Sequence, residues 1–128
     1  MQKSIFLEKY PVCSIEISKS EAKDKTISEV VSFIQEKIET HKVAKFITIF
    51  DNYAHTNGLG GEIMEGIIGA QNIIFCFGPA IPNPKILAVR PRSIGVCEFA
   101  DKYMFEFLEA PKEDLTETMM GWIKALHD

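Results

Sequence analysis

The chain has only two arginines, Arg90 and Arg92, and their spacing favours binding of an anion. Pro91 between them favours an extended backbone for the residue before it. Side chains two positions apart on an extended segment point to the same side, so both guanidinium groups could bind one carboxylate or phosphate. The alternative is that they are solvated or pair with nearby acids. Those acids are Glu98, Asp101, Glu106, Glu109, Glu113, Asp114 and Glu117.

A second polar set lies at Asp51 and His55. If this segment is helical, the two residues share one helix face, and the carboxylate could orient the imidazole for base or metal chemistry. The alternative is that Asp51 caps the helix and His55 is a surface residue. No second histidine is close in the sequence, so a metal site would need Cys76 or Cys97 to approach in space.

Two glycine-rich segments could contribute to a pocket. Gly58 belongs to the first, residues 57–61, which precedes a possible short helix at residues 62–68. Glycines before a helix can expose backbone N–H groups to an anion, although this spacing is neither GxGxxG nor a P-loop and a plain turn also explains it. Gly78 begins the second, a proline-rich loop inside the charge-poor middle of the chain, where pockets often form. Tight turns between buried strands would have the same composition.

These observations define one set of candidate ligand-binding residues. The set is Asp51, His55, Gly58, Gly78, Arg90 and Arg92. No catalytic residue and no metal ligand is assigned, because the sequence has no Ser-His-acid order and no nucleophile elbow. The three cysteines, Cys13, Cys76 and Cys97, lack CxxC spacing and lie in apolar runs, so we expect them to be reduced and buried.

The N-terminal half has clear element signals. Residues 13–18 alternate apolar and polar side chains, which predicts a strand with one buried face. Thr26 and Glu29 fit a capping box at the start of a helix over residues 27–41, whose apolar stripe recurs at helical spacing. Residues 46–50 are almost wholly β-branched and aromatic, which predicts a central strand buried on both faces.

The C-terminal half predicts a strand at residues 73–77, a hairpin over residues 94–108 and a final helix. That helix has an apolar stripe from Leu115 to Leu126. The resulting order favours an α+β fold, in which two main helices cover one face of a mainly antiparallel sheet in a two-layer sandwich. With 128 residues and no linker or repeat, we expect a single domain over residues 1–128.

Composition excludes several classes of function. The net charge of −4 argues against nucleic acid as the main partner. Residues 66–84 carry no formal charge, but their glycines, prolines and asparagines indicate a loop–strand–loop passage, so we expect no membrane span. We find no secretory or transit signal and expect a cytoplasmic protein.

Several short motifs resemble the small bacterial family called domain of unknown function 302. They are Phe50-Asp51, Ala54-His55, Gly58-Leu59 and the run Phe75-Cys76-Phe77-Gly78-Pro79, with Arg90-Pro91 further on. The resemblance covers roughly residues 26–110. It departs from the family pattern where Gly78 runs directly into Pro79, without the asparagine of Phe-Gly-Asn-Pro, and where Arg90-Pro91 replaces a leucine–proline. It implies a compact α+β fold that forms a homodimer, and no established reaction or cofactor.

Three functions remain open on the sequence alone. The first is a cytosolic module that binds a small anionic ligand between residues 51–61, residues 78–84 and the two arginines. The second is a small enzyme or redox protein that uses His55 with Cys76 or Cys97. The third is an oligomerisation or protein-interaction domain without a ligand. Whether the protein is an enzyme, and which cofactor it would need, stays undecided.

Overall fold

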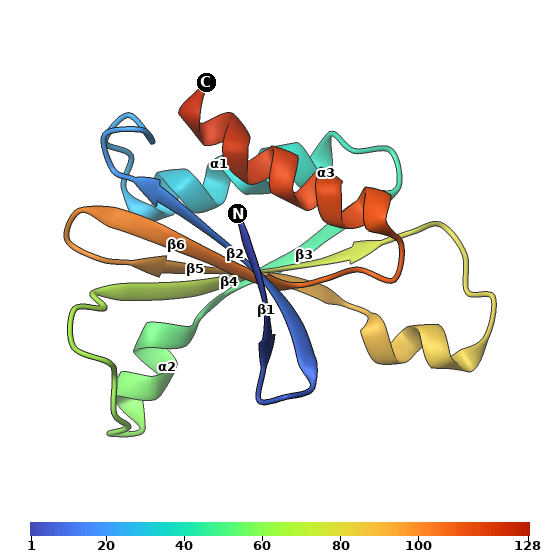
Figure 1. Cartoon of the computed structure of the whole chain (residues 1–128), viewed down its shortest axis with the longest axis horizontal. Helices are drawn as coiled ribbons and strands as arrows, with labels where there is room; N and C mark the ends of the chain where they lie inside the picture. The colour runs from blue at the N-terminus through green and yellow to red at the C-terminus, as the bar shows by residue number, and fades with distance from the viewer.

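The computed structural model describes residues 1–128 and contains one six-stranded antiparallel sheet (Figure 1). The strands are β1 (Gln2–Phe6), β2 (Tyr10–Ser18), β3 (Ala44–Asp51), β4 (Gly69–Phe77), β5 (Arg92–Glu98) and β6 (Lys102–Leu108). The helices are α1 (Ile27–Glu39), α2 (Asn52–Gly58) and α3 (Glu113–Lys124), with 3-10 helices η1 (Pro84–Val89) and η2 (Ala125–His127). The strand order is β1-β2-β6-β5-β4-β3.

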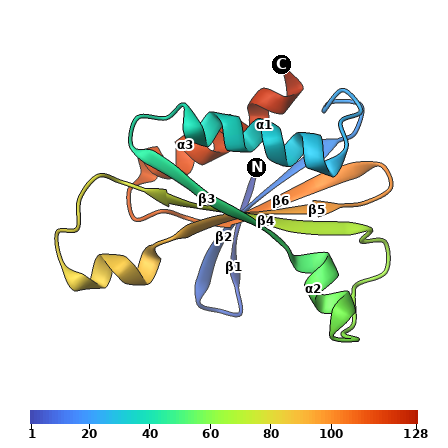
Figure 2. The same ribbon diagram turned by 180° about the vertical axis from the view of Figure 1, so that it is seen from behind.

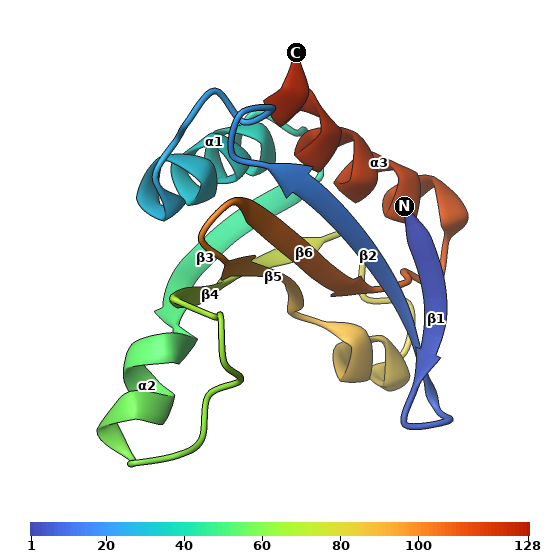
Figure 3. The same cartoon turned by 60° about the vertical axis from the view of Figure 1, so that its left-hand side comes forward.

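Helices α1 and α3 lie together on one face of the sheet (Figures 1 and 2). The other face has no helical layer, and α2, η1 and the β1–β2 hairpin project around it (Figure 3). The α+β architecture expected from the sequence, a two-layer sandwich with two main helices on one face, is therefore confirmed. We call the sheet surface opposite α1 and α3 the open face.

Helix α1 begins at Ile27, directly after its capping residue Thr26. The Thr26 hydroxyl accepts from the Glu29 backbone N–H at 3.2 Å, and the Glu29 carboxylate accepts from the Thr26 N–H at 2.9 Å. These two bonds satisfy donors that a helix start otherwise leaves free. Val30, Val31 and Ile34 bury the apolar stripe against the sheet. The helix ends at Glu39, two residues before the predicted end.

The core fills the space between the helices and the sheet. Alternate residues of the central strands point into it, as the period of a strand requires. Trp122 of α3 stacks on Phe77 of β4, with ring centroids 5.4 Å apart. Tyr103 is fully buried, and its hydroxyl donates to the Lys25 carbonyl at 2.5 Å, so its one polar group is paired.

The prediction of a central strand at residues 46–50 is wrong. These residues lie in β3, one of the two edge strands of the sheet, which pairs only with β4. Ile47 sits at a break in the β3–β4 register and is half exposed, and Phe50 lies on the open face with 42% of its surface exposed. The run is apolar on both sides because Phe46 and Ile49 pack on the core, while Phe50 lies on the other sheet surface, which no helical layer covers.

The helix expected at residues 62–68 does not form. The helix of this region is α2, which begins directly after Asp51. The Asp51 carboxylate accepts from the Ala54 N–H at 2.9 Å and so provides the cap that residues 62–68 lack. Gly66 has a φ of +97°, which a helix does not allow.

The uncharged stretch at residues 66–84 contains β4 and the loops on either side of it. No helix in the structure combines the length and the apolar character that crossing a lipid bilayer requires.

Candidate functional site

The residues that the sequence singled out at Gly78, Arg90 and Arg92 line one cavity of about 300 Å³. The cavity lies between the loop after β4, the 3-10 helix η1 and the start of α3. Its apolar wall includes Phe77, Ile86 and Leu115. Its volume is at the lower end of the range for small-molecule pockets.

Arg90 lies across Gly78 at the rim of the cavity. Its Nη1 donates to the Ala80 carbonyl at 2.7 Å, which holds the guanidinium against the loop. Gly78 has a φ of +103°, a conformation that side chains disfavour. A Cβ at this position would lie 2.5 Å from Arg90 Nη2, so the arginine can approach only because residue 78 is glycine.

Arg92 is the most unusual side chain of the site, because only 8% of its surface is exposed. One guanidinium nitrogen, Nη2, donates to the Leu108 carbonyl, while the buried Nε has no hydrogen-bond partner. Burial lowers the pKa of the Arg92 guanidinium below its ordinary value. Arginine nevertheless stays protonated in proteins, so Arg92 is a buried cation with an unused donor.

No carboxylate neutralises this site. The ion pairs of the chain are Lys3–Glu109, Lys19–Glu98, Lys102–Glu16 and His127–Glu21, and none involves an arginine. The alternative that the arginines pair with Glu98, Glu106 or Glu109 is therefore not what the structure shows. The residues that line the cavity include three cations and no acid.

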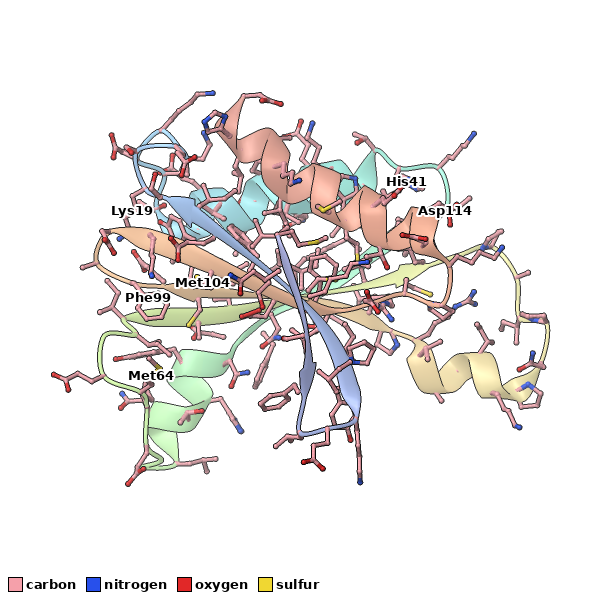
Figure 4. The ribbon with its side chains drawn as sticks, viewed as in Figure 1. Lys19, His41, Met64, Phe99, Met104 and Asp114 are labelled. Carbon is pink, nitrogen blue, oxygen red and sulfur yellow. The ribbon has the colours of Figure 1, made fainter.

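Lys112 is the third cation, and it is not among the site residues predicted from the sequence. It occupies the N-cap position of α3, which has no side-chain cap. The partial positive charge of the helix start adds to that of Lys112, although Glu113 and Asp114 in the first turn offset part of it. Figure 4 labels Asp114 at this end of α3. The sequence feature that could have indicated Lys112 is the pair Pro111-Lys112 directly before a helix. That feature can be recognised only when the start of α3 is known.

The structure does not bring Asp51, His55 and Gly58 to this cavity. Asp51 pairs with Gln71 at the start of β4, whereas Phe77 at the other end of β4 lines the cavity. Gln71 and Phe77 are six positions apart along β4, which is about 20 Å. A ligand of the size of the cavity cannot contact both groups.

Asp51 and His55 have structural roles instead. Asp51 caps α2 through its bond to the Ala54 N–H, and His55 is exposed and lies against Phe50, with ring centroids 5.3 Å apart. The structure thus shows the capping alternative. Gly58 ends α2, and a Cβ there would meet nothing within 4 Å.

The cysteines are free thiols. Cys13 is fully buried, and Cys76 and Cys97 are half-buried. Burial raises the pKa of the Cys97 thiol and the nearby Glu106 raises it further, which disfavours the nucleophilic thiolate. No group of three or more His, Cys, Asp or Glu side chains is arranged to hold a metal ion.

A larger depression of about 540 Å³ lies on the open face, between the β1–β2 hairpin and η1. Arg92 lines this depression as well as the smaller cavity, but the other polar side chains here already have partners. Ser14 donates to Glu106, Lys3 lies 3.1 Å from Glu109, and Asn72 bonds Ser93 at 3.0 Å. The smaller cavity is therefore the better candidate, because it is the one that Arg90 and Lys112 also line.

Comparison with known proteins gives a family but no function. A search of the curated proteins and a search of the solved structures found no match. One family model matches residues 1–128, which is every residue of the chain. The family that matches is not domain of unknown function 302, so the resemblance carried by the short motifs is not shown. The chain therefore belongs to the Family of unknown function (DUF6858).

Proposed function

We propose that this protein is a binding module for a small organic anion, held in the cavity of Arg90, Arg92 and Lys112. One observation carries the proposal: Arg92 is more than nine-tenths buried, has no acidic partner and keeps an unpaired Nε. A buried cation without a counter-ion is costly for a fold, and an anionic ligand would offset that cost. The three free thiols fit a reducing compartment, so we further propose a cytoplasmic location.

The lining of the cavity indicates the ligand class. Arginine binds carboxylates and phosphates through paired N–H donors, so the charged end of the ligand is one of these two groups. Phe77, Ile86 and Leu115 provide an apolar wall for the rest of the molecule. A compact acid with an aromatic or branched aliphatic body meets both requirements, whereas an inorganic ion would leave the apolar wall unused.

The experiment measures binding of benzoate and phenyl phosphate by isothermal titration calorimetry, with uncharged benzyl alcohol as the reference compound. The natural protein should bind at least one of the two anions and bind benzyl alcohol much more weakly. Arg92→Met and Arg90→Gln each remove a charged donor while keeping a long side chain. Each change should weaken binding of the anion by roughly tenfold or more, because a charge-assisted hydrogen bond contributes about 1.5–3 kcal/mol.

Lys85→Gln is the matched control. Lys85 lies in η1, close in sequence to the arginines, but does not line the cavity. Its loss removes one positive charge near the site without removing a contact, so the affinity should change little at physiological ionic strength. Equal weakening by all three variants, or tight binding of benzyl alcohol, would contradict the proposed site.

A further inference from the structure

Most of the exposed apolar side chains of this protein lie away from its helical layer. None of the large hydrophobic residues that are exposed lies on α1 or α3. They lie instead on the β1–β2 hairpin, on β3, around α2, on η1 and at the end of β6. These residues are Ile5, Phe6, Leu7, Tyr10, Ile47, Phe50, Leu59, Met64, Ile68, Leu87, Val89 and Leu108, with Met1 and Ile81 beyond them.

The elements that carry these residues surround the open face. The hairpin tip, η1 and α2 all project on the side opposite α1 and α3 (Figure 3). Met64, beside α2, and Asp114, on α3, lie on opposite sides of the sheet (Figure 4). The open face is thus a sheet surface with an apolar rim.

The total surface of the chain is larger than the average for a monomer of this mass. The accessible area is 7950 Å² for 14.4 kDa. A folded monomer of that mass exposes about 6,800 Å². The excess of about 1,100 Å² is slightly more than the roughly 800 Å² that each partner buries in a stable interface of ordinary size.

Several polar side chains on and around the open face are already paired within the chain. Asn52 donates to Asn72 at 2.9 Å, and Asn72 donates to Ser93 at 3.0 Å. Ser14 donates to Glu106 on the neighbouring strands. Lys102 and Glu16 form an ion pair at 3.1 Å. These groups already have partners within the chain, so a covering surface leaves few of them unsatisfied.

The hairpin tip keeps an exposed leucine in a backbone conformation that leucine disfavours. Leu7 and Glu8 have φ values of 53° and 61°, in the left-handed region where asparagine and glycine are preferred. Leu7 is nevertheless 67% exposed and contacts no core. Such strain is expected where a side chain is kept for contact with another molecule.

We propose that the open face binds a second copy of this chain, to form a homodimer in which the two bare sheet surfaces face each other. The hairpin tip and α2 stand at opposite strand ends and beside opposite edges of the sheet, since Val12 pairs with Leu108 and Asp51 with Gln71. The hairpin tip and α2 therefore lie at the two ends of one diagonal of the sheet. A two-fold axis that runs along the second diagonal, in the plane between the two sheets, places the hairpin of each copy against α2 of its partner. The strands of the two sheets then cross at a steep angle, which is one of the two usual packings of sheet on sheet.

A second copy fits better than an unrelated partner because one chain carries both surfaces that the proposed contact needs. The hairpin offers an apolar projection, and the region of α2 offers exposed apolar residues at the diagonal corner, as an interface between identical copies requires.

The test is the mass of the protein in solution, by sedimentation equilibrium over a micromolar dilution series. The natural chain should sediment at twice 14.4 kDa. Phe50→Asp places a charge on the open face and should weaken the dimer by at least about tenfold. Ser32→Asp places the same charge on the exposed surface of α1 and should leave the dimer unchanged. A monomeric natural chain would assign the face to another partner, and an unaffected Phe50→Asp dimer would place the interface elsewhere; either result overturns the proposal.

Leu7→Asn separates dimerisation from folding. Asparagine suits the left-handed conformation, so the variant should unfold at a higher temperature than the natural chain when both are diluted to monomers. It should nevertheless dimerise more weakly, because it removes an apolar contact. Hydrogen exchange of the natural chain adds a measurement without any substitution: dilution should raise exchange in the hairpin, η1 and α2, and not in α1 or α3. Loss of protection in α1 and α3 alone would contradict the proposal.

Discussion

Gly78 decides where the guanidinium of Arg90 can lie. Because a Cβ would meet Arg90 Nη2 at 2.5 Å, Gly78→Ala must displace the end of the arginine side chain. We expect this variant to lose roughly 1–3 kcal/mol of stability through its positive φ and to bind phenyl phosphate several-fold more weakly. Calorimetric titration measures the second effect and urea denaturation the first.

The control for Gly78→Ala is Gly60→Ala. Gly60 also has a positive φ, of 69°, but a Cβ there meets no atom within 4 Å. The control should therefore show backbone strain without a loss of affinity. If both variants weaken phenyl phosphate equally, the close contact between Gly78 and Arg90 has no role in binding.

Tyr103 links stability to alkaline pH. Burial, with smaller contributions from the negative charges of Glu98 and Glu29, raises the pKa of Tyr103 to about 12. An unfolded tyrosine ionises near pH 10, so the neutral buried form stabilises the fold below that pH and this contribution disappears as pH rises toward 12. The free energy of unfolding should fall by about 2 kcal/mol more in the natural protein than in Tyr103→Phe over this interval. Guanidinium denaturation at each pH measures the free energy of unfolding of both proteins. Equal decreases in the natural protein and in Tyr103→Phe would refute the role assigned to Tyr103.

At the scale of elements, α1 depends on its capping box. Thr26→Ala removes the acceptor of the Glu29 N–H and should cost on the order of 1 kcal/mol of unfolding free energy, measured by urea denaturation. Thr26→Ser keeps a hydroxyl at the same position and should cost much less. Equal losses in the two variants would mean that the methyl group, and not the hydrogen bond, stabilises the helix start.

Elements with a regular period could be predicted from the sequence, and those set by long-range packing could not. The period of α1, the alternation in β2 and the hairpin of β5 and β6 are local properties, and the structure contains all of them. The position of β3 in the sheet is not local. A run such as residues 46–50 is equally apolar in a central strand and in an edge strand whose outer side is bare, and only the strand order distinguishes the two cases.

The same division applies to the site. Gly78 and Arg90 could be placed together because only a short segment separates them in sequence. Lys112 enters the cavity from α3, more than twenty residues later, and no spacing in the sequence indicates that contact. Asp51 and His55 were grouped with the arginines by their chemistry, but the length of β4 separates them.

At the scale of the whole molecule, the proposed ligand should act as a stabiliser. A ligand that binds only the folded chain adds about 2.7 kcal/mol to the free energy of unfolding at one hundred times its dissociation constant. Phenyl phosphate should therefore raise the thermal midpoint of the natural protein and raise that of Arg92→Met clearly less, since a tenfold loss of affinity leaves about 1.4 kcal/mol of stabilisation at the same concentration. Without ligand, Arg92→Met should be within about 1 kcal/mol of the natural protein or more stable, because it removes a buried charge. A loss of several kcal/mol would make Arg92 a structural residue.

The strand order also determines how the chain can reach its folded state. Strands β3 to β6 follow one another both in sequence and in the sheet, so each can pair as soon as the next has been synthesised. The β1–β2 hairpin is different, because Cys13 pairs with Phe107, and the intervening chain must close as a long loop. Contacts this distant in sequence slow folding. During synthesis the β1–β2 hairpin therefore stays unpaired, with its apolar residues exposed, until β6 has left the ribosome. A chaperone that recognises exposed apolar segments is expected to bind the chain during this interval.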